Sequence, residues 1–226
     1  MEGMYNLVKD FFSHDMDLDD LFDSEAIIWI DWREYDEDVV RYFNDMMAEP
    51  IDIQTVSNGK PYGDDIVLKN GNKELQIPYG DEQDRDVTIK YFNDFVKPDY
   101  EVRWFTESLG NDTLGFTVLS GAEWAKLDDE FGADVVRYYF EPIDFESDMF
   151  NLGMDEVFSL LALRENSEGI DTQFSTQLDW IRIINKEKAL AEQKENGQID
   201  LKQYMVAKKE LQQSKDDFIA AHGPMK

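Results

Sequence analysis

Apolar residues recur at helical spacing in several stretches of the first two thirds of the chain. In the first stretch, Tyr5, Val8, Phe11 and Phe12 fall on one side of a helix. Ser120 stands three residues before Glu123, which is the spacing of a capping box, and Gly132 provides a stop signal. The pattern predicts helices over residues 5–12, 16–22, 36–49, 84–96 and 121–131.

Strand-like patterns lie between these helices. Residues 26–30 form a continuous apolar run that ends at Asp31 and Trp32. Asn70-Gly71 separates two short apolar runs and is a favoured hairpin turn. Because helices are mixed with at least two hairpins, we expect an α+β fold, with a largely antiparallel sheet and flanking helices. The expected strands cover residues 26–30, 51–56, 66–68, 75–77, 102–104 and 114–119.

The last third of the chain has a different character. Residues 180–194 and 201–221 are expected to be helices, joined at Asn196-Gly197, with Asp200 as the N-cap of the second. We therefore expect an acidic α+β domain over residues 1–165 and a C-terminal helical hairpin over residues 172–222.

The hairpin sequence resembles a known module. Leu190, the Gly197 turn, Ile199 with Asp200, and Tyr204 followed by Lys208-Lys209-Glu210-Leu211 are similar to the short C-terminal helical hairpin called the SHOCT domain. The chain has Tyr204 where that family usually has Phe. The resemblance implies an accessory role in oligomerisation or partner contact, and it carries no catalytic residues. The residues assigned to oligomerisation are Ile184, Leu190, Tyr204, Leu211 and Phe218.

Charge divides the chain in the same way. Residues 1–165 contain 40 Asp and Glu against 13 Lys and Arg, whereas residues 166–226 contain 10 against 9. An acidic surface of this kind repels nucleic acid and anionic lipid, and it attracts basic partners over roughly a Debye length, about 8 Å at physiological salt. The abundance of Phe, Tyr and Trp indicates that the acidic region is folded.

Several classes of site receive no support from the sequence. The chain has no Cys, which excludes disulfides and thiolate metal sites and fits a reducing compartment. The two histidines, His14 and His222, lie near the termini, and we find no phosphate-binding glycine loop or nucleophile elbow. The first residues do not resemble a signal peptide, and no apolar run is long enough to span a membrane. We expect a cytoplasmic protein without cofactor or metal.

Two short strings recur. Val40-Arg41-Tyr42-Phe43-Asn44-Asp45 is echoed 49 residues later by residues 89–94, and residues 136–140 are a looser copy. The paired aromatics are expected to face a common core, with the basic residue of each copy neutralising nearby carboxylates. The echo is either a true repeat or the ordinary appearance of an amphipathic helix.

The remaining hypothesis is that the protein binds a partner through its surface. Trp32 follows the most apolar strand and stands among carboxylates and Tyr35, and aromatic anchors ringed by charge are typical of interfaces, although Trp32 could instead belong to the core. A second acidic stretch, residues 141–148, is interleaved with apolar residues. We expect these segments to contact a basic protein, and not nucleic acid or a membrane. The candidate partner-binding residues are Asp19, Asp20, Trp32, Glu34, Tyr35, Asp36, Asp144, Glu146 and Asp148.

The leading hypothesis is a non-enzymatic binder, an inhibitor or immunity-type protein that masks a basic partner, such as a nucleic-acid-binding protein, by imitating nucleic acid. Residues 101–105, 112–116 and Glu123-Trp124 are similar to small acidic bacterial proteins of the immunity type. One alternative is a metal-dependent hydrolase that uses Asp31 and its acidic neighbours. The other is a structural adaptor that assembles through its C-terminal hairpin.

Overall fold

The computed structural model describes residues 2–60, 64–166 and 172–225. The chain divides into two compact units, Met1–Asn151 and Leu152–Lys226, called here unit 1 and unit 2. The boundary differs from the expected one near residue 165, because the helix Met154–Asn166 packs on the helix that follows it. Unit 2 is therefore a three-helix unit, of which the expected hairpin is a part.

Unit 1 is built on a four-stranded antiparallel sheet, which confirms the α+β fold. Its strands are β1 (Ile28–Asp31), β6 (Thr113–Ser120), β5 (Tyr100–Phe105) and β7 (Phe140–Pro142), in that spatial order. The short 3-10 helix η1 (Thr106–Ser108) lies between β5 and β6. Because β1 pairs with β6 and not with its neighbour in sequence, the sheet joins the start of the unit to its end.

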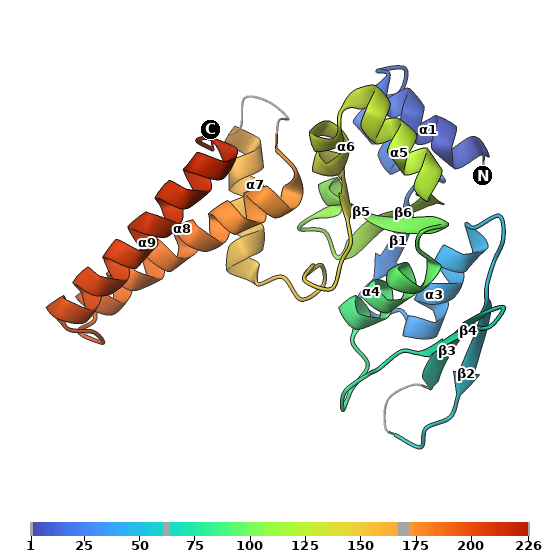
Figure 1. Ribbon diagram of the computed structural model, residues 1–226, viewed down its shortest axis with the longest axis horizontal. Helices are drawn as coiled ribbons and strands as arrows, with labels where there is room; N and C mark the ends of the chain where they lie inside the picture. Colours follow the sequence, from blue (N-terminus) through green and yellow to red (C-terminus); the bar gives the residue numbers. More distant parts are fainter. Residues whose placement is uncertain (1, 61–63, 167–171, 226) are drawn as a thin grey trace. The chain divides into compact units, whose positions relative to one another are not determined.

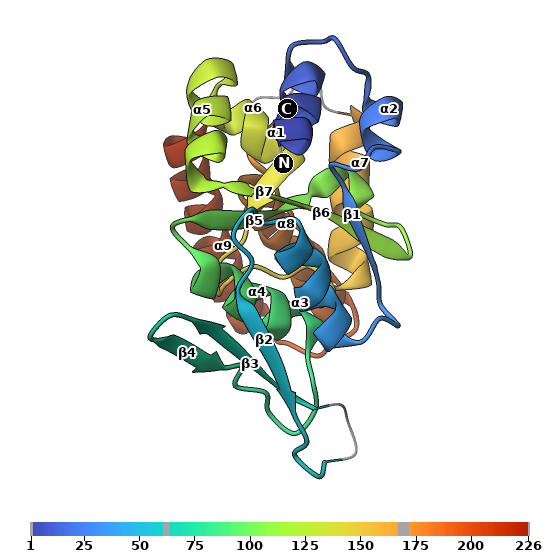
Figure 2. The ribbon, with the colours of Figure 1, turned by 90° about the vertical axis from the view of Figure 1, so that its right-hand side faces the viewer.

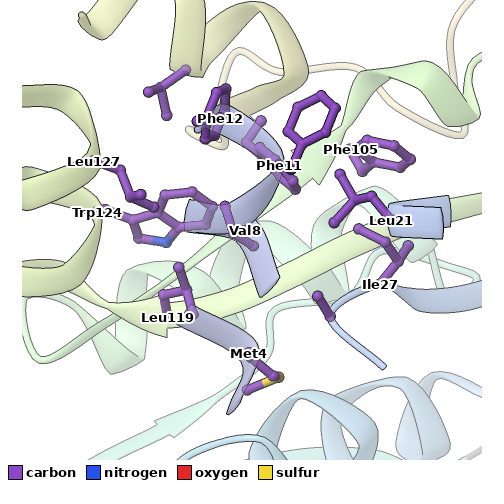
Figure 3. Close-up of a cluster of buried hydrophobic side chains, with 13 residues drawn as sticks. Met4, Val8, Phe11, Phe12, Leu21, Ile27, Phe105, Leu119, Trp124 and Leu127 are labelled. Carbon is purple, nitrogen blue, oxygen red and sulfur yellow. The ribbon is translucent and has the colours of Figure 1, made fainter. Parts of the chain in front are cut away.

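Helices cover both faces of this sheet (Figures 1 and 2). The helices α1 (Glu2–Phe12), α5 (Gly121–Phe131) and α6 (Ala133–Tyr139) lie on one face, together with the short α2 (Leu18–Phe22). Trp124 and Leu127 of α5 face Val8 and Phe12 of α1 in the cluster shown in Figure 3. The expected capping box at Ser120 and Glu123 is present.

The other face carries α3 (Asp36–Asp45) and α4 (Arg85–Val96). Phe43 of α3 packs on Phe92 of α4 and on Phe116 of β6, with ring centroids 5.7 and 5.6 Å apart. The second aromatic residues of the first two copies thus meet in one core, whereas Tyr42 is 38% exposed and the third copy lies in α6 and β7. Asn44 Oδ1 accepts a hydrogen bond from Ile51 N, and Asn93 Oδ1 accepts one from Val102 N, so each copy fixes the strand segment that follows it.

A second sheet contains β2 (Asp52–Val56), β3 (Asp65–Asn70) and β4 (Lys73–Gln76), in that order and antiparallel. Gly71 forms the predicted β3–β4 turn with a φ of 58°, a left-handed value that glycine adopts without steric cost. Ile66 and Leu68 of β3 are buried, whereas both flanking strands are largely exposed.

Unit 2 consists of α7 (Met154–Asn166), α8 (Phe174–Glu195) and α9 (Leu201–His222). Gly197 forms the turn between α8 and α9 with a φ of 68°, and Asp200 caps α9 in a capping box with Gln203. Trp180 of α8 packs on Phe218 of α9, with ring centroids 5.2 Å apart. The hairpin has the predicted geometry, while its relation to the SHOCT family stays a prediction.

Candidate partner-binding surface

The loop between β1 and α3, residues 31–36, presents two aromatic side chains to solvent. Trp32 is 61% exposed and Tyr35 is 72% exposed. Trp29, three residues before Trp32, is half-buried and packs on Phe22. Trp32 therefore lies on the surface and not in the core, and we call residues 31–36 the aromatic loop.

A single arginine of α4 fixes the backbone of this loop. Arg85 donates from Nη1 to the carbonyl of Asp31 at 2.7 Å and from Nη2 to the carbonyl of Glu34. Its Nε donates to Asp36 Oδ1 at 2.6 Å. Because all three nitrogen atoms of the planar guanidinium donate, Arg85 holds the loop near both of its ends, and the Trp32 and Tyr35 side chains stay exposed.

The Asp36 carboxylate takes part in this contact and is not on the surface. Its side chain is 5% exposed, and its second oxygen accepts a hydrogen bond from Thr88 Oγ1 at 2.6 Å. Thr88 Oγ1 in turn lies 2.6 Å from the hydroxyl of Tyr79, whose pKa burial raises. The assignment of Asp36 to the partner-binding surface is therefore wrong in its detail: this carboxylate supports the surface from beneath.

The other polar residues of the loop make local contacts. Asp31 Oδ1 accepts a hydrogen bond from the backbone of Arg33, whose guanidinium lies over the Trp32 ring at 4.9 Å. Glu34 accepts a hydrogen bond from the hydroxyl of Tyr42 at 3.3 Å, and the negative charge of Glu34 raises the Tyr42 pKa. Tyr42 is 38% exposed, so it extends the aromatic surface from the loop onto α3.

The chain just after the second acidic segment is held by the same turn of α4. The buried Asp86 accepts hydrogen bonds from the backbone N–H groups of Met149, Phe150 and Asn151, at 2.9, 2.9 and 3.1 Å. Burial raises the Asp86 pKa, and these three donors oppose that rise. The Phe150 ring also lies 5.4 Å from the Arg85 guanidinium. Consecutive residues of α4 thus hold the aromatic loop and residues 149–151, which follow the second acidic segment.

The remaining candidate residues occupy separate positions. Asp144 and Glu146 are exposed, and Asp144 Oδ1 accepts hydrogen bonds from the backbone of Glu146 and the hydroxyl of Ser147. Asp148 is half-buried. Asp19 and Asp20 are exposed on α2, which precedes β1, whereas the aromatic loop follows it. The aromatic loop contacts α4 at Arg85, whereas the second acidic segment contacts it further along, through Ile143 on Asn93 and Phe145 on Tyr91.

The side chains assigned to oligomerisation are partly or fully buried by packing within unit 2. Phe218 is buried, and Ile184, Leu190, Tyr204 and Leu211 are half-buried. Leu190 and Leu211 line a shallow groove between α8 and α9. Sequence reasoning missed the more exposed hydrophobic residues of this unit, which are Met154, Phe158, Leu161, Leu201, Met205, Val206 and Ile219.

Within residues 2–60, 64–166 and 172–225, no group of three or more His, Asp or Glu side chains is arranged to hold a metal ion. None of the helices in these ranges is long and apolar enough to cross a membrane.

The chain was compared with known protein families, proteins and structures. No family model, no curated protein and no solved structure matches the chain.

Proposed function

We propose that this protein is a non-enzymatic binding module that masks a basic protein partner, as an inhibitor or immunity-type protein does. The observation that carries the proposal is the aromatic loop: Trp32 and Tyr35 are exposed while Arg85 fixes the loop backbone. Large aromatic side chains on a fixed loop bury area without a large loss of conformational entropy, and they dominate many interfaces.

Charge supports the choice of a basic partner. Unit 1 contains 37 Asp and Glu against 12 Lys and Arg, a net charge of −25, whereas unit 2 contains 13 against 10, a net charge of −3. Some carboxylates of unit 1 are neutralised internally, as Asp128 is by Arg103 and Arg137. The excess that remains accelerates the approach of a cationic protein and disfavours anionic ones.

The proposal assigns separate roles to the two kinds of residue. Trp32 and Tyr35 make the short-range contacts that determine how long the complex lasts. Glu34, which lies in the loop, and Asp144 and Glu146, which are exposed on the second acidic segment, contribute mainly to the rate of association. A nucleic-acid-binding protein or a cationic enzyme presents the surface that such carboxylates would cover.

The test is binding of purified basic proteins, beginning with those encoded beside this gene, measured by surface plasmon resonance. The double variant Trp32→Ala/Tyr35→Ala should dissociate at least about 30-fold faster, which corresponds to a hot spot of about 2 kcal/mol. Val56→Ala is the matched control, because Val56 is 49% exposed in the same unit but lies on β2. Binding that is equally insensitive to both changes would show that the loop is not the contact.

A further inference from the structure

Asparagine followed by glycine occurs three times in the chain, at residues 58–59, 70–71 and 196–197. All three glycines have a positive φ and lie in turns or loops. In such a pair the backbone nitrogen of glycine attacks the side-chain amide of asparagine, because glycine has no side chain that hinders the approach. The three pairs are therefore alike in sequence, and the fold decides which of them can react.

The reaction is a spontaneous deamidation. The glycine nitrogen forms a bond to Cγ of the asparagine, the bond between Cγ and Nδ2 breaks, and the amide leaves as ammonia with the proton that the glycine nitrogen loses. Water then opens the resulting five-membered succinimide at either carbonyl. The product is an aspartate, or an isoaspartate in which the backbone runs through the former side chain.

The end of α8 protects Asn196. This residue is the C-cap of α8, and Gly197 N donates to the carbonyl of Lys194 at 3.2 Å. Gln198 N donates to the carbonyl of Gln193 at 2.9 Å, which completes a Schellman motif. Because the attacking nitrogen is already used as a donor, the reaction at Asn196 requires the end of α8 to unwind.

The side chain of Asn58 is held at both of its polar atoms. Its Nδ2 donates to Asp65 Oδ1 at 2.7 Å, and its Oδ1 accepts a hydrogen bond from Lys60 N at 2.8 Å. Asn58 is also half-buried. These contacts fix the plane of the amide, and Asp65 retains the group that must leave.

Asn70 has neither kind of protection. It is exposed at the end of β3, and its backbone pairs with Lys73 across the two-residue turn of Gly71 and Asn72. Among the described residues, none accepts a hydrogen bond from Gly71 N, and none forms a hydrogen bond with the Asn70 side chain. The pair that closes a hairpin opens locally at low cost. We propose that Asn70 is the site at which this protein deamidates and isomerises.

The isoaspartate product changes the hairpin. It adds one methylene group to the backbone at position 70, where β3 and β4 begin to pair. Lys73, the cross-strand partner, is held separately, since its Nζ donates to the carbonyl of Phe95 at 2.6 Å. In β4 only Leu75 is half-buried, and the other side chains are exposed. We therefore expect β4 to lose its pairing with β3 near the turn.

Deamidation of the full-length protein at mildly alkaline pH tests the proposal. After digestion at acidic pH, mass spectrometry measures the converted fraction at each of the three positions. In the native protein Asn70 should convert at least about tenfold faster than Asn58 or Asn196, since each hydrogen bond that must break slows the reaction by up to roughly tenfold. In urea the three rates should converge. Equal rates in the native protein would overturn the proposal, as would the same preference for Asn70 in urea.

Two variants test the physical causes. Asp65→Ala removes the acceptor that holds the Asn58 amide, so it should accelerate conversion at Asn58 and leave the rate at Asn70 unchanged. Asn70→Asp carries the charge of the product on an unaltered backbone. Amide hydrogen exchange in β4 should therefore be faster in the isoaspartate form than in Asn70→Asp. Equal exchange would contradict the expected loss of pairing, and an unchanged rate at Asn58 would contradict the protection by Asp65.

Discussion

The Arg85 guanidinium and the Asp36 carboxylate lie 49 residues apart in sequence and meet at 2.6 Å between Nε and Oδ1. Both side chains are nearly buried, and the same guanidinium holds the carbonyls of Asp31 and Glu34. The pair therefore connects the start of α4 to the loop that exposes Trp32 and Tyr35.

Replacing Arg85 with Met should destabilise the protein by about 3–5 kcal/mol, because it leaves Asp36 buried without its charge partner. Urea unfolding measures this as a lower midpoint. Arg41→Met is the control: Arg41 pairs with Asp38 at 3.1 Å on the surface, and such pairs contribute about 0–1 kcal/mol. Comparable small losses in the two variants would indicate that the Arg85 anchor is not important for stability.

Asp86 should give the protein a pH dependence of defined sign. Its folded pKa is raised by burial, so the folded state holds this proton more tightly than the unfolded state does. The corresponding stability is present below the ordinary Asp value of about 3.9 and is lost as pH rises through the raised value.

The free energy of unfolding of wild type, relative to Asp86→Asn, should therefore be largest at low pH and decrease above about pH 4. Asp94→Asn, an exposed change on the same helix, controls for the loss of one negative charge. An advantage of wild type that increases over this pH range would reverse the assigned sign.

The contacts of Asp86 also define where unit 1 ends. A fragment of residues 1–151 retains the N–H groups of Met149, Phe150 and Asn151, whereas a fragment of residues 1–148 lacks all three. We expect the longer fragment to fold and the shorter one to be less stable by at least about 1–3 kcal/mol, the cost of leaving a buried polar group unsatisfied. Thermal melting followed by circular dichroism compares them, and equal melting temperatures would contradict this boundary.

Much of the fold could be predicted because its signals are local. The Asn70-Gly71 turn and the Ser120–Glu123 capping box are each determined by residues close in sequence, and both are present. The aromatic loop was found in the same way, from aromatics beside acids at a strand end. Helix α7 was missed, because residues 154–165 were assigned to the acidic domain without a predicted helix.

The role of Asp36 could not be predicted from local pattern. Its position in the first turn of α3 suits the helix dipole, and the sequence there looks like an exposed acidic cluster. Only the tertiary fold brings Arg85 and Thr88 to it from α4. The same limit applies to Asp86, whose three donors come from residues 149–151.

Metal binding distinguishes the binding module from the hydrolase alternative. Asp31 is engaged with the backbone of Arg33, and Asp36 with Arg85. Titration calorimetry with calcium, magnesium or manganese should therefore show no site tighter than roughly millimolar, the range of weak calcium modules. A stoichiometric micromolar site that disappears in Asp31→Asn would favour the hydrolase over the binding module.

The central claim is that charge brings a basic partner to unit 1 and that the aromatic loop retains it. The most direct measurement is the association rate of such a partner as a function of salt, for wild type and for Trp32→Ala. We predict that both association rates fall steeply and in parallel as salt rises, because long-range attraction is screened, while Trp32→Ala dissociates faster at every salt concentration. An association rate that is the same at low salt and at several times physiological salt would contradict the account.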